Sequence, residues 1–168
     1  GSQERPGQTR DASGQYAGSD SRADRPLLVV LPSGGFKEED LNEVKIWFQK
    51  KGIPYQPASS KTGQLKSISQ QCRLEVKTKI SDYSPAEYSG LVFVGGHVQE
   101  YKPQGTHAKI VHDMIKKSLR AGHPVVGIGS GQWVLESHTD TDQGSSREEN
   151  GLKLRQMAEG TLILVQDS

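Results

Sequence analysis

The sequence has few of the features that support disulfide bonding, membrane insertion or nucleic-acid binding. It contains one cysteine, Cys72, so neither an internal disulfide nor a cysteine-rich metal site can form. No apolar run approaches the roughly 18 residues that a membrane-spanning helix needs. The net charge of +1 lacks the basic excess of nucleic-acid-binding proteins. We therefore expect no membrane span and no nucleic-acid partner. These features do not determine the cellular compartment, although they slightly favour the cytoplasm.

Apolar residues are also scarce, at 32% of the chain, and the N-terminal segment accounts for much of this. Residues 1–26 show no apolar periodicity, and their four acidic residues balance four arginines. Such a segment cannot bury enough surface to offset the entropy lost on ordering. We predict a disordered tail or linker over residues 1–26 and one domain over residues 27–168. Gly1-Ser2 is typical of residues left by cloning, so the domain is expected to belong to a longer protein.

Short, continuous apolar runs stand out in the rest of the chain, at residues 27–31, 91–94, 125–128 and 161–165. Runs of this kind are typical of parallel strands that are buried on both faces. Amphipathic patterns at residues 38–51 and 106–121 predict helices between them. Alternating strands and helices predict an α/β fold: a three-layer sandwich with a mainly parallel sheet and helices on both faces, as in flavodoxin-like proteins.

The remaining segments have weaker patterns. Two prolines in residues 53–57 predict a peripheral strand, and the polar residues 61–69 predict a turn or short hairpin. Residues 72–80 alternate between apolar and polar, which predicts a half-buried strand with Cys72 packed inward as a small hydrophobe. Residues 140–150 are expected to form a solvated loop.

The most informative stretch is Pro124–Leu135, in which an apolar run ends in three glycines interleaved with Ile128 and Ser130. This pattern predicts a strand that turns sharply into a helix, the elbow on which many α/β enzymes carry a nucleophile. The tip of the turn is Gly129, which has no side chain. In a parallel sheet, sites form at the carboxyl ends of the strands. Three predicted loops meet this rule: residues 32–37, 95–98 and 129–132.

These motifs, taken in order, resemble the ThiJ/PfpI family, within the class I glutamine-amidotransferase-like fold. They are Leu91-Val92-Phe93-Val94-Gly95-Gly96, Gly122-His123-Pro124-Val125-Val126 and Gly127-Ile128-Gly129-Ser130-Gly131. In the family, the last motif is similar to Ala-Ile-Cys-His-Gly, with the cysteine as the nucleophile. The resemblance places Gly129 at the cysteine and Ser130 at the neighbouring histidine. It therefore implies a degenerate member that lacks the nucleophile.

The resemblance also implies roles for residues outside the elbow. The carboxylate that hydrogen-bonds the thiol in the family falls at Asp40, with Glu39 one residue away. Gly95 and Gly96 match glycines whose backbone N–H groups face the nucleophile. The segment between the elbow helix and the last strand is much shorter than in the family, so we do not carry over the family's protease, deglycase or glyoxalase-like activities.

The residue types at the elbow bear on catalysis. Gly129 excludes covalent cysteine chemistry at this position. Ser130 does not complete a Gly-x-Ser-x-Gly elbow, because Ile128 and Gln132 stand where the glycines belong. We expect its hydroxyl to cap the following helix. A carboxylate at Asp40 is favourable in the first turn of a helix whatever its function.

Among the five histidines, His97 is the best placed for function, because it follows Gly95–Gly96 at the end of a strand. His138 reaches the same rim if the elbow helix is short. His112 and His123 are expected on the surface. His107 and His112 are five residues apart and face different sides of a helix, so we predict no metal site and no cofactor.

The leading hypothesis is a non-catalytic binding or interaction module. Its vestigial pocket would bind a small anion through the segments Gly95-Gly96-His97 and Gly129-Ser130-Gly131, where backbone N–H groups converge. The alternative is a cysteine-independent hydrolase or lyase that uses Asp40, His97 and Ser130. A third possibility is a protein partner or a homodimer, because members of the family often self-associate.

Overall fold

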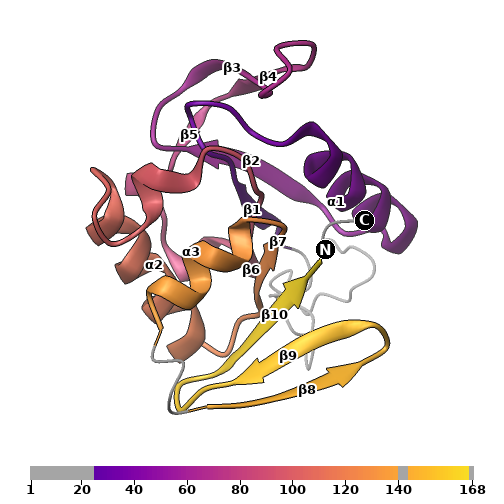
Figure 1. Cartoon of the computed structure of the whole chain (residues 1–168), viewed down its shortest axis with the longest axis vertical. Coiled ribbons are helices and arrows are strands. Elements are labelled where there is room, and N and C mark those ends of the chain that lie inside the picture. Colours follow the sequence, from indigo (N-terminus) through magenta and orange to yellow (C-terminus); the bar gives the residue numbers. More distant parts are fainter. Residues whose placement is uncertain (1–24, 140–143, 167–168) are drawn as a thin grey trace, which may run out of the picture.

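The computed structural model describes residues 25–139 and 144–166, and an eight-stranded sheet forms its centre (Figure 1). The strands run in the order β5-β2-β1-β6-β7-β10-β9-β8. Their bounds are β1 (Leu27–Val30), β2 (Tyr55–Ser59), β5 (Thr78–Lys79), β6 (Gly90–Phe93), β7 (Val125–Ile128), β8 (Ser145–Glu149), β9 (Leu152–Gln156) and β10 (Thr161–Val165). The helices are α1 (Glu38–Lys51), α2 (Ala108–Arg120) and α3 (Gly131–Ser137), and 3-10 turns cover Ile80–Asp82, Pro85–Glu87 and Val98–Tyr101.

The centre of the sheet is parallel. Strand β1 lies between β2 and β6, with Leu28 beside Gln56 on one side and Leu91 on the other. Strand β7 pairs in parallel with β6 and β10, whereas β9 and β8 extend the sheet in antiparallel fashion. The apolar runs at residues 27–31, 91–94, 125–128 and 161–165 correspond to these central strands, which confirms the predicted mainly parallel sheet.

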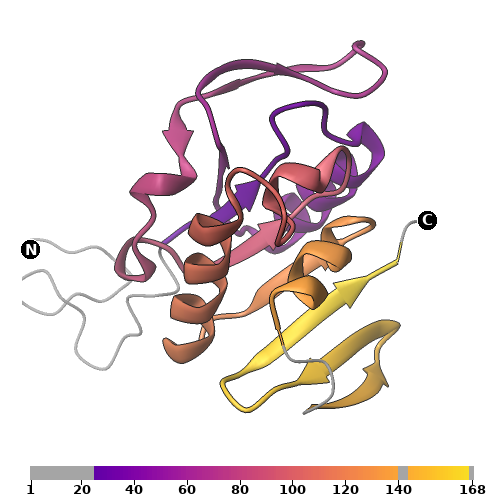
Figure 2. The same ribbon diagram turned by 60° about the vertical axis from the view of Figure 1, so that its left-hand side comes forward.

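Helices cover both faces of the sheet (Figure 2). Successive strand residues point to opposite faces, so β1 contributes to two cores. Leu28 packs in the cluster that contains Val111 and Ile115 of α2. Val29 packs in the cluster that contains Leu41 and Phe48 of α1. The three-layer α/β sandwich is therefore confirmed.

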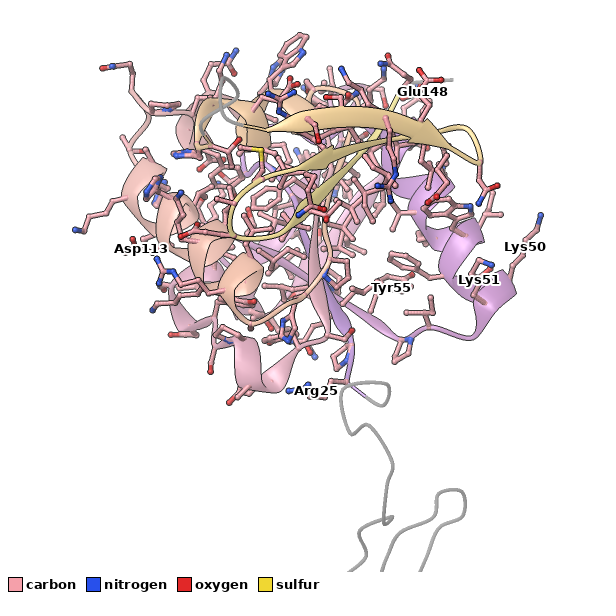
Figure 3. The ribbon with its side chains drawn as sticks, turned by 90° about the horizontal axis from the view of Figure 1, so that it is seen from below. Arg25, Lys50, Lys51, Tyr55, Asp113 and Glu148 are labelled. Atoms are coloured by element: carbon pink, nitrogen blue, oxygen red, sulfur yellow. The ribbon has the colours of Figure 1, made fainter. Side chains whose placement is uncertain are left out.

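The ends of α1 follow the local signals in the sequence. Glu38, Glu39 and Asp40 occupy its first turn, where negative charge suits the helix dipole. Gly52 ends the helix in the left-handed conformation, with φ at 65°, and its N–H bonds the carbonyls of Phe48 and Gln49. The charged side chains of Lys50 and Lys51 project outward beside this end (Figure 3). Among the described residues, no helix has the length and apolar content to cross a lipid bilayer.

Two segments differ from the expectation. The predicted strand over residues 72–80 is divided: β4 (Arg73–Val76) pairs with β3 (Gly63–Lys66) in a separate hairpin, and β5 joins β2 at the sheet edge. The turn or short hairpin predicted within residues 61–69 is replaced by a longer hairpin, in which these residues supply β3 and the turn covers residues 67–72.

The predicted loop over residues 140–150 is wrong for its described part, because β8 and β9 form a hairpin there. Every residue of β8 is exposed, and Glu148 projects from the outer edge of the sheet (Figure 3). Such a strand has no buried face, so it leaves no apolar alternation in the sequence. Residues 140–143 and 1–24, the latter including nearly all of the predicted tail, lie outside the described residues.

Candidate functional site

The elbow between β7 and α3 has the predicted geometry. Gly129 has a φ of 58°, in the left-handed region that favours glycine, and its N–H donates to the Val165 carbonyl over 3.0 Å. Gly131 begins α3 in direct contact with β6, since a Cβ there would lie 2.1 Å from the carbonyl oxygen of Phe93. The tip of the elbow therefore presents backbone alone.

The turn that follows β6 is bonded to the side chains around it. The Gly95 N–H donates to Oδ2 of Asp40 over 3.2 Å, and the Gly96 N–H donates to Oγ of Ser130 over 2.9 Å. The Ser130 hydroxyl donates in turn to the Gly96 carbonyl over 3.3 Å. We expected both glycine amides to remain available to a ligand; this expectation is corrected, because side chains of the protein already accept them.

The position of Ser130 also corrects its predicted role. It is the N-cap residue of α3, but its side chain makes no capping hydrogen bond. Its hydroxyl reaches the Gly96 backbone instead. Asp40 approaches the same point and is only 2% exposed. A Cβ added to Gly95 would lie 2.5 Å from Oδ2 of Asp40 and 2.8 Å from Oγ of Ser130, so the structure brings these two side chains together.

The three predicted loops meet at the carboxyl edge of the sheet. Lys37 donates its backbone N–H to the Gly95 carbonyl over 2.9 Å, and Phe36 forms a β-bridge with Gly96. Ser130 links the Gly96 backbone to the elbow. Segments that are far apart in the sequence are thus fixed against one another.

A cavity of about 390 Å³ opens beside the elbow. Its lining includes Lys37, Gly129 and Ser130, with two large apolar side chains, Trp133 (58% exposed) and Ile68 (47% exposed). The amides of Ser130 and Gly131 have no partner within α3, because they precede the first residues that can bond back along the helix. The cavity thus combines a lysine, backbone donors and an apolar rim.

A second cavity, of about 370 Å³, adjoins the first and shares Ile68 with it. Lys61, Lys66 and the exposed His97 line this cavity. Within the described chain, His97 makes no hydrogen bond to Asp40 or Ser130. The structure therefore brings together two of the three residues that the alternative enzyme hypothesis needs, and places the third in the neighbouring cavity.

The loop over residues 67–72 is the part of the site that sequence reasoning missed. It joins β3 to β4, and its Ile68 lines both cavities. Phe36 forms a β-bridge with Ser67, and the Ile68 N–H donates to the Phe36 carbonyl over 2.9 Å. Its sequence, Ser-Ile-Ser-Gln-Gln-Cys, is that of an ordinary polar turn. No local signal placed it beside the elbow.

His138 does not reach the rim of the elbow, which corrects the prediction. It is 7% exposed and lies at the opposite end of α3 from Gly131. Its Nε2 donates to the Tyr101 carbonyl over 2.6 Å, and its Nδ1 lies 3.3 Å from Nδ1 of His112. Burial lowers its pKa; the nearby His112 has the same effect, and the bond to Tyr101 opposes it.

The positions of His112, His123 and Cys72 can also be compared with those predicted from the sequence. His112 is exposed, as expected, but His123 is buried at 6% exposure, so its predicted surface position is wrong. Cys72 is half-buried against the α1-side core, in line with its predicted packing role. Across residues 25–139 and 144–166, no three His, Cys, Asp or Glu side chains converge in a group that could hold a metal ion.

Comparison with known proteins decides the family. The sequence profile of the DJ-1/PfpI family matches residues 26–146, which is most of the chain. The chain belongs to the DJ-1/PfpI family. The ThiJ/PfpI resemblance of its motifs is thus confirmed at the level of the family. No curated protein matches the sequence.

Solved DJ-1/PfpI structures share this fold. The ThiJ/PfpI domain protein of Brachyspira murdochii superposes with a TM-score of 0.66 at 16% identity, over 83% of this chain and 87% of that one. Oxidised DJ-1 of Toxoplasma gondii superposes with a TM-score of 0.62 at 13% identity, over 82% of each chain. DJ-1beta of Drosophila melanogaster superposes with a TM-score of 0.60 at 16% identity, over 84% of this chain and 81% of that one. The TM-scores, at identities this low, establish a common fold and nothing more specific.

Proposed function

We propose that this DJ-1/PfpI domain binds a small anionic ligand in the elbow cavity and performs no covalent catalysis there. One observation carries the proposal: the reactive positions of the elbow are either empty or already engaged. Gly129 supplies no nucleophile at the tip. The side chains of Ser130 and Asp40 accept the backbone N–H groups of Gly96 and Gly95. They hold the loops in place.

Charge and shape support an anionic ligand with an apolar part. Lys37 lines the elbow cavity, and Lys61 and Lys66 line the adjoining one. Positive side chains around a hollow raise the local concentration of anions. Trp133 and Ile68 offer apolar surface on the same rim. A small carboxylate or phosphate ester with a short carbon skeleton fits this combination.

The enzyme hypothesis requires a base that can activate the Ser130 hydroxyl. The proximity of Asp40 and Ser130 favours it, but His97 faces the adjoining cavity. Turnover of small esters separates the two proposals: if Ser130→Ala abolishes a measurable hydrolysis, the domain is an enzyme. A protein partner or a homodimer stays a prediction alongside ligand binding.

Trp133 provides a direct test of binding. In a Trp47→Phe background it is the sole tryptophan, so its fluorescence reports on the elbow cavity. We expect phosphate, acetate or pyruvate to produce a saturable change at low ionic strength. Lys37→Gln should raise the apparent Kd about fivefold or more, because a charged partner contributes roughly 1 kcal/mol or more in such a hollow.

Lys50→Gln is the matched control. Lys50 lies in the last turn of α1, about 20 Å from Lys37 at about 1.5 Å per residue. Lys50→Gln removes the same charge without changing the cavity, so the Kd of this variant should equal that of the parent protein. If both substitutions weakened anion binding equally, the effect would come from the overall charge of the protein and not from the cavity. A fluorescence signal that no anion changes would overturn the proposal.

A further inference from the structure

His112 and His138 form a second polar site at the opposite end of α3 from the elbow. They come from different elements: His112 lies within α2, and His138 follows the last residue of α3. Their Nδ1 atoms are 3.3 Å apart, and the ring planes are inclined at 58°. Both rings line a cavity of about 520 Å³.

The hydrogen bond to Tyr101 fixes the protonation of His138. A backbone carbonyl only accepts hydrogen bonds, so Nε2 of His138 carries the proton in the 2.6 Å contact. In the neutral ring Nδ1 is then unprotonated, and its lone pair lies on the side of His112. A neutral imidazole whose other N–H is held by a carbonyl is the usual form of a metal-bound histidine.

The separation of the two nitrogens also matches the spacing of two ligands on one metal ion. At 3.3 Å the contact is a long hydrogen bond, because N–H donors usually lie about 2.9–3.0 Å from their acceptors. Two nitrogens on one tetrahedral zinc ion are about 3.3 Å apart, because each Zn–N bond is about 2.0–2.1 Å.

We propose that His112 and His138 bind a divalent transition-metal ion of the class that imidazole prefers, such as Zn²⁺, between their Nδ1 atoms. The two rings supply two ligands, and water completes the coordination from the cavity. His112 is exposed, which gives the ion a path of entry. Asp113 also lines the cavity and adds negative charge, whereas Lys109 is an exposed side chain long enough to turn into solvent. The site is independent of the elbow.

Zn²⁺ titration of the untagged, ¹⁵N-histidine-labelled protein tests the proposal. We expect the Nδ1 resonances of His112 and His138 to shift together and to saturate, while Nε2 of His138 keeps its proton. His112→Asn and His138→Gln should each weaken Zn²⁺ binding at least about tenfold, the size that even an outer-shell change produces. His107→Asn removes an imidazole near the start of α2, outside the pair, and should leave the affinity unchanged.

Three results would overturn the site: a shift confined to one ring, no shift up to millimolar Zn²⁺, or equal binding by His112→Asn and the parent protein. His112→Asn is the decisive variant, because an exposed position tolerates the change without loss of folding. The unfolding midpoint of each variant without zinc is its own reference, because His107 also contacts Glu100 and Thr106. Zinc should raise the midpoint of His107→Asn and leave that of His112→Asn unchanged.

Discussion

At the scale of single residues, the site is built from polar groups that bond to backbone. Asp40 and Ser130 hold the Gly95–Gly96 turn. The buried Tyr101 hydroxyl donates to the Leu31 carbonyl over 2.7 Å at the end of β1, and burial raises its pKa above the usual value. Each contact joins loops that come from different strands. These side chains therefore act first as positioning groups for the carboxyl edge of the sheet.

His138 makes the free energy of unfolding depend on pH. Its pKa in the folded protein is lowered, chiefly by burial, so the unfolded chain binds the proton more readily. The stabilising contribution is complete above the unfolded pKa of about 6.5 and is lost as the pH falls below it. Urea unfolding between pH 8 and pH 5 should therefore show a decline in stability below about pH 6.5 that His138→Gln reduces.

His112→Asn serves as the control for this effect. It removes the positive charge that also lowers the pKa of His138 but leaves the burial, so the decline should persist and become shallower. If His138→Gln retains the full slope of the parent protein, the pH dependence arises from other groups and the assignment is wrong.

At the scale of elements, the strongest prediction concerns the contact between α3 and β6. Gly131 allows the first turn of α3 to touch the Phe93 carbonyl, and any side chain must displace one of them. Gly131→Ala should lower the free energy of unfolding by about 1–3 kcal/mol, the usual cost of overpacking. Chemical denaturation measures this directly.

Gly34→Ala is the comparison for that variant. The nearest atom to its added Cβ is 4.0 Å away, in His97, so we expect a change within about 0.5 kcal/mol. Equal effects of the two substitutions would mean that α3 is free to move away from β6. The rigid elbow described above would then be incorrect.

The sequence predicts elements well where burial imposes a pattern. Continuous apolar runs identify β1, β6 and β7, which are buried on both faces, and β10, which is buried on one face and partly buried on the other. The hairpin of β8 and β9 was missed, since residues such as Arg147 and Glu148 carry no mark of a buried face. Its pairing is a property of the backbone and of the neighbouring β10.

At the scale of the whole molecule, the candidate site is a product of topology. The order β1-β6-β7 brings the ends of three parallel strands to one edge, and this arrangement followed from the sequence. The hydrogen-bond partners did not follow from the sequence. The sequence predicts that Ser130 caps α3 and that the Gly95–Gly96 amides face a ligand, and the structure differs on both points. These outcomes depend on sub-ångström placement of loops, which no local pattern encodes.

Local sequence patterns also did not predict the position of the loop over residues 67–72 or the contact between His112 and His138. Ile68 reaches the elbow because β3 and β4 form a hairpin over the sheet edge. His138 meets His112 because α3 has only seven residues and ends beside α2. Both contacts join residues that are distant in the sequence, so they became visible only in the folded chain.

The central claim is that the elbow is a binding site for small anions. An amide-resolved NMR titration of the ¹⁵N-labelled protein with phosphate and small carboxylates tests it most directly. The account predicts saturable shifts concentrated at Lys37, Gly96 and Gly129–Trp133, which in Lys37→Gln all require about fivefold more ligand or still higher concentrations. Shifts that are absent, or that scatter over surface lysines such as Lys50 and keep the same midpoint in Lys37→Gln, would contradict it.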